Sequence, residues 1–495
     1  MALYSSRDQE MTQKTQKQRG GYYTPEQVVA TLLRWAIRRD TDRLLDPACG
    51  DGRFIAGHRR SVGVETDAAA AQVAVVRAPW ALVHEGDFFT WAGNTNERFE
   101  CAAGNPPFIR YQNFNGDTRS RALALCAQLG ADFTGLTSSW APFLVAAAGL
   151  LNPGGRLAFV VPAEIGHAPY SAPLLRYLVG HFSVVHLVAI KEKLFPDLSE
   201  DCWLLYAEDY GGKANTIRLT AVRQFATSQD PPENFVSVSI NELQSKWNGR
   251  LRPFLMSQAA RELYLTASRM SGVVRLSEVA SVGIGYVTGA NEFFHLRRSQ
   301  AERWSIPNRL LRQTVRRGEV LPRERLTRAT VEAWERNDEP ILLLALPRSG
   351  TLPKPVMNYL ETEDAKTAKL TYKCRNRTPW YSVPDVNTPD FFLSYMSGLQ
   401  PNLVRNEAEC TGTNSVHMVR LRRRQDARFL ETAWRSSLVR LSCELEGHPL
   451  GGGMLKLEPR EAGRILLPPV DMPAYDEAIV TEALATMRSW RHIAG

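Results

Sequence analysis

The chain contains, at positions 100–108, the stretch Glu100-Cys101-Ala102-Ala103-Gly104-Asn105-Pro106-Pro107-Phe108. Its first four residues form a short apolar run, which predicts a buried strand. Proline lacks an N–H and has a fixed φ, so the two prolines cannot continue that strand. The chain must therefore leave the predicted sheet in a rigid loop at a strand's carboxyl end, which is where open α/β sheets bind ligands.

This loop carries groups that suit chemistry on an aromatic amine such as N6 of adenine. The amine is a poor nucleophile because its lone pair is delocalised into the ring, and two acceptors aimed at its hydrogens would localise that pair. The Asn105 side-chain oxygen and the Pro106 carbonyl can be those acceptors, and Phe108 offers a flat face for the base. An isolated Asn-Pro-Pro is nevertheless more often a plain strand end that terminates in a proline turn.

Composition describes a globular protein of more than one domain. The 495 residues are too many for one ordinary core, and 44% apolar with 23% charged residues is a globular composition. There is no apolar run of about 18 residues, and the polar residues 1–20 predict a mobile tail rather than a secretory signal. The seven cysteines form no Cys-x-x-Cys pair, so neither a metal site nor a disulfide framework is indicated, and a cytoplasmic protein is expected.

The net charge of +8 is unevenly distributed along the chain. Residues 1–250 contain 25 basic and 25 acidic side chains, whereas residues 251–495 contain 35 basic and 27 acidic ones. A neutral half followed by a basic half predicts chemistry in the first and binding of a polyanion by the second.

The first half alternates short apolar runs with helical stretches, which predicts a doubly wound, mostly parallel sheet. A helix is expected near 139–151, followed by a turn at Asn152-Pro153-Gly154-Gly155. The polar stretch 230–250 is interpreted as a linker, which gives domains at 21–245 and 246–495. The predicted strands are 43–46, 62–65, 81–87, 100–105, 156–162, 183–190 and 202–208.

The loops after the first three predicted strands carry glycines and acids. The turn Asp46-Pro47-Ala48-Cys49-Gly50-Asp51-Gly52 lets backbone pass close to a ligand. Glu65 ends the second strand, where it can accept both hydroxyls of a ribose, and Asp87 with Phe88 follows the third, where they can hold an adenine. Gly-x-Gly-x-x-Gly is absent, so phosphate binding is not favoured. Acidic side chains are suited to binding S-adenosylmethionine, whose amino group and sulfonium are cationic. Asp46 is the candidate to bind the amino group.

Taken in order, these motifs resemble those of the γ-class N6-adenine DNA methyltransferases, the TaqI-like group of restriction–modification enzymes. The resemblance implies a Rossmann-like S-adenosylmethionine-dependent methyltransferase sheet, followed by a C-terminal mixed α+β domain that recognises double-stranded DNA. The matching stretches are Gly21 to Val28, Asp46 to Phe54, Val62 to Asp67, Gly86 to Phe89, Gly104 to Phe108, Val282 to Phe294, Arg375 to Val383 and Gly451 to Pro459.

The resemblance also implies roles for single residues. The target adenine would be held by Asn105, Pro106 and Phe108, with Phe195 as a second aromatic on the flipped base. The residues that would contact the cofactor, or lie against it, are Thr24, Pro25, Asp46, Ala48, Gly50, Glu65, Asp87, Phe88, Asn105 and Pro107. In one departure from the family, Ser138-Ser139-Trp140 stands where Asp-Leu-Tyr is common, which leaves the support of the loop at Asn105 open.

Other functions remain open at this point. Methylation of cytosine N4 uses the same chemistry, and a catalytically inactive DNA-binding specificity protein is a rival of another class. Cytosine C5 methylation would need a cysteine nucleophile, typically in Pro-Cys, and this dipeptide is absent. Both a separate partner endonuclease and an enzyme without one are compatible with the sequence.

Overall fold

The computed structural model describes residues 24–196, 198, 200–472 and 475–493, so the predicted tail at 1–20 lies outside the described residues. The chain divides into two compact units, Met1–Leu255 (unit 1) and Met256–Gly495 (unit 2).

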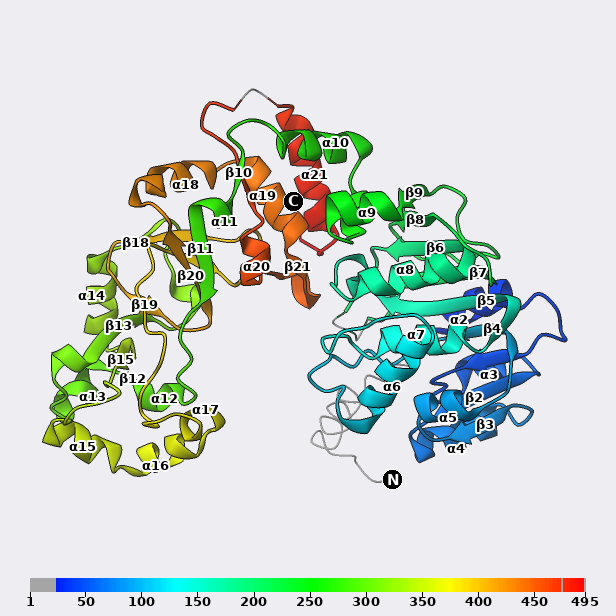
Figure 1. Ribbon diagram of the computed structural model, residues 1–495, viewed down its shortest axis with the longest axis horizontal. Coiled ribbons are helices and arrows are strands. Elements are labelled where there is room, and N and C mark those ends of the chain that lie inside the picture. The colour runs from blue at the N-terminus through cyan, green and yellow to red at the C-terminus, as the bar shows by residue number, and fades with distance from the viewer. Residues whose placement is uncertain (1–23, 197, 199, 473–474, 494–495) are drawn as a thin grey trace, which may run out of the picture. The chain divides into compact units, whose positions relative to one another are not determined.

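Unit 1 is built on a nine-stranded sheet with the order β3-β2-β1-β4-β5-β7-β6-β8-β9 (Figure 1). Strands β1 to β5 pair in parallel, and β7 is antiparallel to both of its neighbours, β5 and β6. The predicted doubly wound sheet is confirmed. Its strands are β1 Leu44–Asp46, β2 Ser61–Glu65, β3 Leu82–Glu85, β4 Phe99–Gly104, β5 Leu151–Pro162, β6 Phe182–Ile190, β7 Cys202–Tyr210, β8 Thr216–Val222 and β9 Val236–Ser239.

Helices in unit 1 connect these strands and bury their apolar faces against the sheet. Val28, Leu32 and Trp35 recur at helical spacing in α2, and this face packs on β4 and β5 in the main core of the unit. The helices are α2 Glu26–Ala36, α3 Arg53–Ala56, α4 Ala68–Arg77, α5 Phe88–Asn94, α6 Gly116–Gln128, α7 Trp140–Ala148, α8 Ser171–His181 and α9 Ile240–Trp247, with 3₁₀ turns at Ala163–Gly166 and Arg252–Leu255.

The turn predicted at residues 152–155 is wrong in one respect, because it lies inside a strand. Helix α7 ends at Ala148 and β5 already begins at Leu151. Leu151 pairs with Phe99, but Arg156 pairs with Cys101, so residues 152–155 bulge out opposite a single residue of β4. The Pro-Gly-Gly segment makes a local bulge because pairing with β4 resumes on both sides of it.

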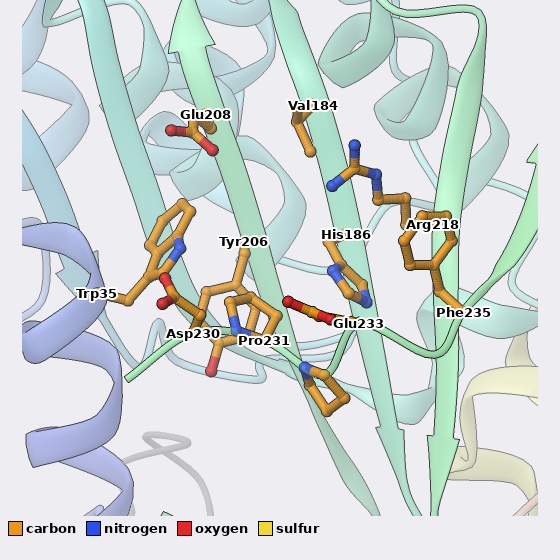
Figure 2. A pocket seen from close by; sticks show the side chains of 11 residues that line it. Trp35, Val184, His186, Tyr206, Glu208, Arg218, Asp230, Pro231, Glu233 and Phe235 are labelled. Atoms are coloured by element: carbon orange, nitrogen blue, oxygen red, sulfur yellow. The ribbon is translucent and has the colours of Figure 1, made fainter. Parts of the chain in front are cut away.

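The linker predicted at residues 230–250 is also wrong, because this segment is part of unit 1. Strand β9 pairs with β8, and α9 buries Leu243 and Trp247. Figure 2 shows the preceding loop lying along β6, β7 and β8, where it walls a pocket of about 400 Å³ with Trp35 of α2. The Arg218 guanidinium lies 4.8 Å from the centre of the Phe235 ring. A four-residue strand is too short for periodicity to reveal, so only its polar flanks were visible in the sequence.

Unit 2 combines several small sheets with short helices, as expected for a mixed α+β domain (Figure 1). Its largest sheet has the order β11-β20-β16-β18-β14, and the others are β12-β15-β13-β19, β17-β22-β21 and β10-β23. The strands are β10 Val274–Arg275, β11 Ala280–Ile284, β12 His295–Leu296, β13 Leu311–Val315, β14 Arg325–Leu326, β15 Leu342–Leu344, β16 Phe391–Ser394, β17 Met396–Ser397, β18 Leu403–Asn406, β19 Thr411–Gly412, β20 Val416–Leu421, β21 His448–Pro449, β22 Leu455–Lys456 and β23 Leu466–Leu467.

Helices of unit 2 surround these sheets and enclose three apolar clusters. They are α10 Gln258–Ala267, α11 Leu276–Val279, α12 Asn291–Phe294, α13 Arg298–Arg303, α14 Arg328–Arg336, α15 Lys354–Leu360, α16 Glu363–Leu370, α17 Tyr372–Arg375, α18 Ala427–Ala433, α19 Ser437–Glu446, α20 Pro459–Ala462 and α21 Glu477–Ser489. Across the described residues, every helix is too short or too polar to cross a membrane.

Candidate active site

The strand order of unit 1 reverses direction between β1 and β4, which pair side by side. From β1 the chain proceeds outward to β2 and β3, and then returns to place β4 on the other side of β1. Loops at the carboxyl ends of these two strands diverge at such a switch point and leave a crevice for ligands. Asp46 ends β1, and Asn105 directly follows β4.

Asp46 and the loop at Asn105 meet at Gly104. A Cβ atom built on Gly104 would lie 2.6 Å from Asp46 Oδ1, so only glycine allows the carboxylate to rest against this strand. Asp46 is buried and accepts a hydrogen bond of 3.2 Å from the Ala48 N–H. Burial raises the pKa of the Asp46 carboxyl to about 8, with smaller contributions from the nearby Glu65 and Asp51 carboxylates.

Glu65 organises the glycine turn after β1. Its Oε2 accepts from the Gly50 N–H at 2.9 Å, and its Oε1 accepts from the Asp67 N–H at 2.8 Å. Gly50 has a φ of +52°, and open space surrounds the position that its Cβ would take. The turn therefore presents bare backbone to a ligand. Each Glu65 oxygen keeps acceptor capacity for hydroxyl groups, because a carboxylate oxygen can accept more than one hydrogen bond.

The start of α2 reaches the same region. The Arg53 guanidinium, at the beginning of α3, donates to the Thr24 carbonyl at 3.1 Å. Thr24 is buried, and the Pro25 carbonyl accepts from the first turn of α2. Thr24 is thus tied to Arg53, the residue that follows the glycine turn.

Asp87 and Phe88 have local structural roles at the end of β3. Asp87 caps α5 and accepts from the Thr90 N–H at 2.9 Å, and the same oxygen, Oδ2, lies 3.5 Å from Arg121 Nε. Phe88 is buried, with its ring stacked on Phe143 at 5.3 Å between centroids. Asp87 also lines a surface depression with Gly86 and Trp91, so this carboxylate stays reachable.

The loop after β4 is only partly buried. Pro106 is buried, whereas Asn105, Pro107 and Phe108 are partly exposed. Phe108 packs against the main core of unit 1, the cluster to which Phe195 belongs. Phe195 is only 6% exposed, so it lies in this core rather than at its surface.

Ser139 supplies the support that the sequence left open. Its hydroxyl donates to the Pro107 carbonyl and accepts from the Ile109 N–H at 3.0 Å, and its own N–H donates to the Ile109 carbonyl at 3.0 Å. Ser139 precedes α7 but does not cap it through its side chain. The hydroxyl therefore clamps the loop at Asn105. The contact joins residues from separate segments of the chain, so this role was not predicted.

Further hydrogen bonds hold the residues that follow Ser139 and Phe108. Trp140 Nε1 donates to Glu164 at 2.8 Å and to the Tyr170 hydroxyl at 3.0 Å. Burial raises the pKa of the Glu164 carboxyl, and its hydrogen bonds from Tyr170 and Trp140 oppose that rise. Arg110 donates to Glu200 at 2.8 Å and so ties the loop to the segment that follows Phe195. None of these partners carried a recognisable sequence signal, because they come from distant segments.

The groups at the carboxyl ends of β1 and β2 fit S-adenosylmethionine. The bare backbone at Gly50 leaves room for a ligand, and the carboxylates of Asp46 and Glu65 suit a cationic amino group and ribose hydroxyls. The neighbouring Asp51 is not a candidate for the cofactor, because it forms ion pairs with Arg53 at 3.2 Å and with Arg77.

Both halves of the chain match known protein families. Residues 246–493 match the family described as Type II methyltransferase M.Eco57I, C-terminal domain. The chain belongs to this family. Residues 67–195 match the Eco57I restriction-modification methylase family, and residues 4–76 match the N-6 DNA Methylase family. The chain is thus a restriction–modification DNA methyltransferase specific for adenine N6, which confirms the reaction expected from the sequence, and the family implies the use of S-adenosylmethionine.

Full-length relatives support the same assignment. The methyltransferase is 19% identical to the Type II methyltransferase M.AccI of Acinetobacter calcoaceticus, over 95% of this chain and 89% of the relative. It is 23% identical to the Type II methyltransferase M.XamI of Xanthomonas campestris pv. amaranthicola, over 91% and 85%. Among solved structures, the Type IIL restriction-modification enzyme MmeI in complex with DNA aligns with a TM-score of 0.54 at 12% identity. That alignment covers 93% of this chain but 65% of MmeI, and it supports the fold alone.

Proposed function

We propose that this methyltransferase holds a flipped adenine at Asn105, Pro106 and Phe108 and receives S-adenosylmethionine at the adjoining glycine turn. The observation that carries this proposal is the contact at Gly104, where the Asp46 carboxylate touches the strand that leads into Asn105. An acceptor for an amine and an acceptor for a cationic cofactor thus lie on neighbouring strands.

The loop residues would act directly on the adenine amine. The Asn105 side-chain oxygen and the Pro106 carbonyl accept the two N6 hydrogens, which localises the nitrogen lone pair and stabilises the positive charge that develops on nitrogen. Pro107 shapes the loop, with its carbonyl held by Ser139. Because the loop is fixed beforehand, its acceptors need little reorganisation during the reaction.

The cofactor residues would place the methyl group in front of this amine. When bound, S-adenosylmethionine supplies an electrophilic methyl carried on sulfur. Asp46 would accept the amino group and Glu65 the ribose hydroxyls, while Ala48 and Gly50 line the turn. The remaining residues proposed for this site are Thr24 and Pro25 at the start of α2, and Asp87 and Phe88 at the adenine end.

The buried Asp46 carboxyl predicts a pH dependence of cofactor binding. Its pKa is raised to about 8, so it is mostly protonated below that pH, and pairing with a cation requires loss of the proton. Affinity for S-adenosylmethionine without DNA should therefore rise towards tenfold per unit between about pH 6 and pH 7.5. Calorimetric titration at several pH values measures this slope. Asp46→Asn should bind weakly without the slope, while Asp40→Asn, at an exposed carboxylate, should behave as wild type.

A pH-independent affinity in the wild type, or an unchanged slope in Asp46→Asn, would contradict the role given to Asp46. Glu65→Ala should also weaken binding, because the ribose loses its acceptors and the Gly50 turn loses its anchor. That loss should leave the pH slope in place, which separates the two carboxylates.

Unit 2 is proposed to recognise double-stranded DNA, because the whole positive excess of the chain lies beyond residue 250. Phosphate contacts release counterions, so the affinity of the full chain for duplex DNA should fall steeply as salt increases. A plot of log Kd against log salt concentration tests this, and a flat plot would contradict the assignment. A fragment for comparison should end at Leu255 rather than near 245, because α9 belongs to unit 1.

The restriction–modification family also makes a separate restriction endonuclease for the same DNA site the expected partner of this enzyme. Methylation at that site would protect the host DNA from cleavage. Sequencing of methylated bases in a host that expresses the protein would define the site.

A further inference from the structure

The corner between α16 and α17 in unit 2 exposes two large apolar side chains (Figure 1, yellow). Leu370 is 77% exposed, the highest value among the exposed large apolar residues that the structure describes, and Tyr372 is 67% exposed. They flank Thr371, whose hydroxyl donates to the Ala368 carbonyl at 2.8 Å. Two large apolar side chains exposed next to one another make this corner a candidate contact surface.

The corner is rigid, which makes its exposure a fixed property of the fold. Ala365 and Ala368 of α16 and Cys374 of α17 are buried in the core of unit 2. The Cys374 thiol contacts the Thr288 carbonyl at 3.5 Å. The Arg377 guanidinium holds that same carbonyl at 2.7 Å. Leu370 and Tyr372 therefore stand on a backbone that is anchored from both helices.

The charges around the corner indicate what covers it. Residues 363–377, which include α16 and α17, contain five basic side chains and two acidic ones, Glu363 and Asp364. Lys366 pairs with Glu363, and the Arg375 guanidinium lies 5.5 Å from the centre of the Tyr372 ring. Within the described part of the chain, Lys369, Lys373 and Arg375 form no ion pair with a carboxylate. An apolar tip beside basic side chains that form no ion pair is complementary to nucleic acid, which has apolar bases between rows of phosphates.

We propose that Leu370 and Tyr372 form a wedge that enters the base stack of duplex DNA while the surrounding lysines and Arg375 contact its phosphates. Apolar side chains inserted at a base step unstack it partly and kink the duplex. The wedge would thus hold the DNA in a bent conformation on unit 2. This inference rests on the proposed binding of DNA by unit 2 and adds the mode of contact.

The test uses the full chain and a duplex that contains the site the enzyme methylates. Fluorophores at the two ends of the duplex report its bending by energy transfer. The variant Leu370→Ala/Tyr372→Ala should bind that duplex about ten- to a hundredfold more weakly and bend it less. Its affinity for unrelated DNA and the salt slope should stay unchanged. Both side chains are exposed, so the fold is not at risk, and unchanged binding of S-adenosylmethionine verifies it. Met357→Ala, at a 44% exposed residue of α15, is the matched control.

A second variant separates the wedge from the charges. Lys369→Ala/Lys373→Ala should weaken binding to any DNA and reduce the salt slope by about 2, while bending is kept. Wild-type affinity and bending in the Leu370→Ala/Tyr372→Ala variant would overturn the wedge, as would an equal loss for unrelated DNA. Salt-insensitive binding by the wild type would instead overturn DNA binding by unit 2 itself.

Discussion

Replacing Asn105 with alanine should lower the rate of methyl transfer on the order of a hundredfold and leave the fold of unit 1 intact. The side-chain oxygen is one of two preorganised acceptors for the adenine amine, and loss of one such contact commonly has this effect. Asn105 is only partly buried, and the loop keeps its proline geometry and the Ser139 clamp. Single-turnover transfer to duplex DNA, followed by analysis of the modified base, measures the change.

Two companion variants make this test specific. Asn113→Ala removes an exposed amide from the same loop and should react as wild type. Ser139→Ala removes the clamp on Pro107 and Ile109 while keeping both acceptors, so its rate should lie between wild type and Asn105→Ala. Ser139 is a positioning residue, and its loss should lower kcat without changing the affinity for S-adenosylmethionine. Full activity in Asn105→Ala would refute the role given to this loop.

The sequence predicted the parts of the site that depend on one segment each. Asn105 follows an apolar run and precedes two prolines, and Asp46 begins a glycine turn, so their places at strand ends were readable locally. Contacts between segments could not be read in this way. The Gly104–Asp46 approach depends on the pairing of β1 with β4, and the Ser139 clamp joins residues about thirty positions apart. The burial of Phe195 could not be predicted for the same reason, because it depends on packing in a core that includes residues of α2 and β4.

The errors in the fold prediction have a common physical origin. Residues 152–155 and 230–250 are rich in turn-forming and polar residues, which locally favour loops. In the structure, strand pairing overrides that preference, with β5 continuing past its bulge and β9 adding to the edge of the sheet. The energy of such pairing comes from distant strands and leaves no periodic pattern in a short segment.

Replacing Phe108 with alanine should retain DNA binding but reduce methylation, with a smaller population of flipped adenine. A paired adenine has its amine engaged by thymine inside the stack, so it must rotate out at a cost of a few kcal/mol. Stacking on an aromatic ring offsets roughly 1–3 kcal/mol of that cost, and Phe108 is the partly exposed ring next to the acceptors. Its loss should therefore lower the flipping equilibrium by about five- to 150-fold. Phe195 is the less direct platform, because it must first turn out of the core.

Fluorescence of 2-aminopurine placed at the target position reports the flipped state. Wild-type protein should raise the signal at that position and not at a neighbouring one, and Phe108→Ala should reduce the rise. Phe225→Ala is a matched control, because Phe225 is a partly buried ring on the same core cluster but follows β8 rather than β4. If Phe108→Ala methylates normally, or the wild type gives equal signals at both positions, then Phe108 does not stack on the flipped base. If Phe225→Ala also lowers methylation, the loss comes from the core that both rings pack on. The control therefore distinguishes stacking on the base from support of the loop.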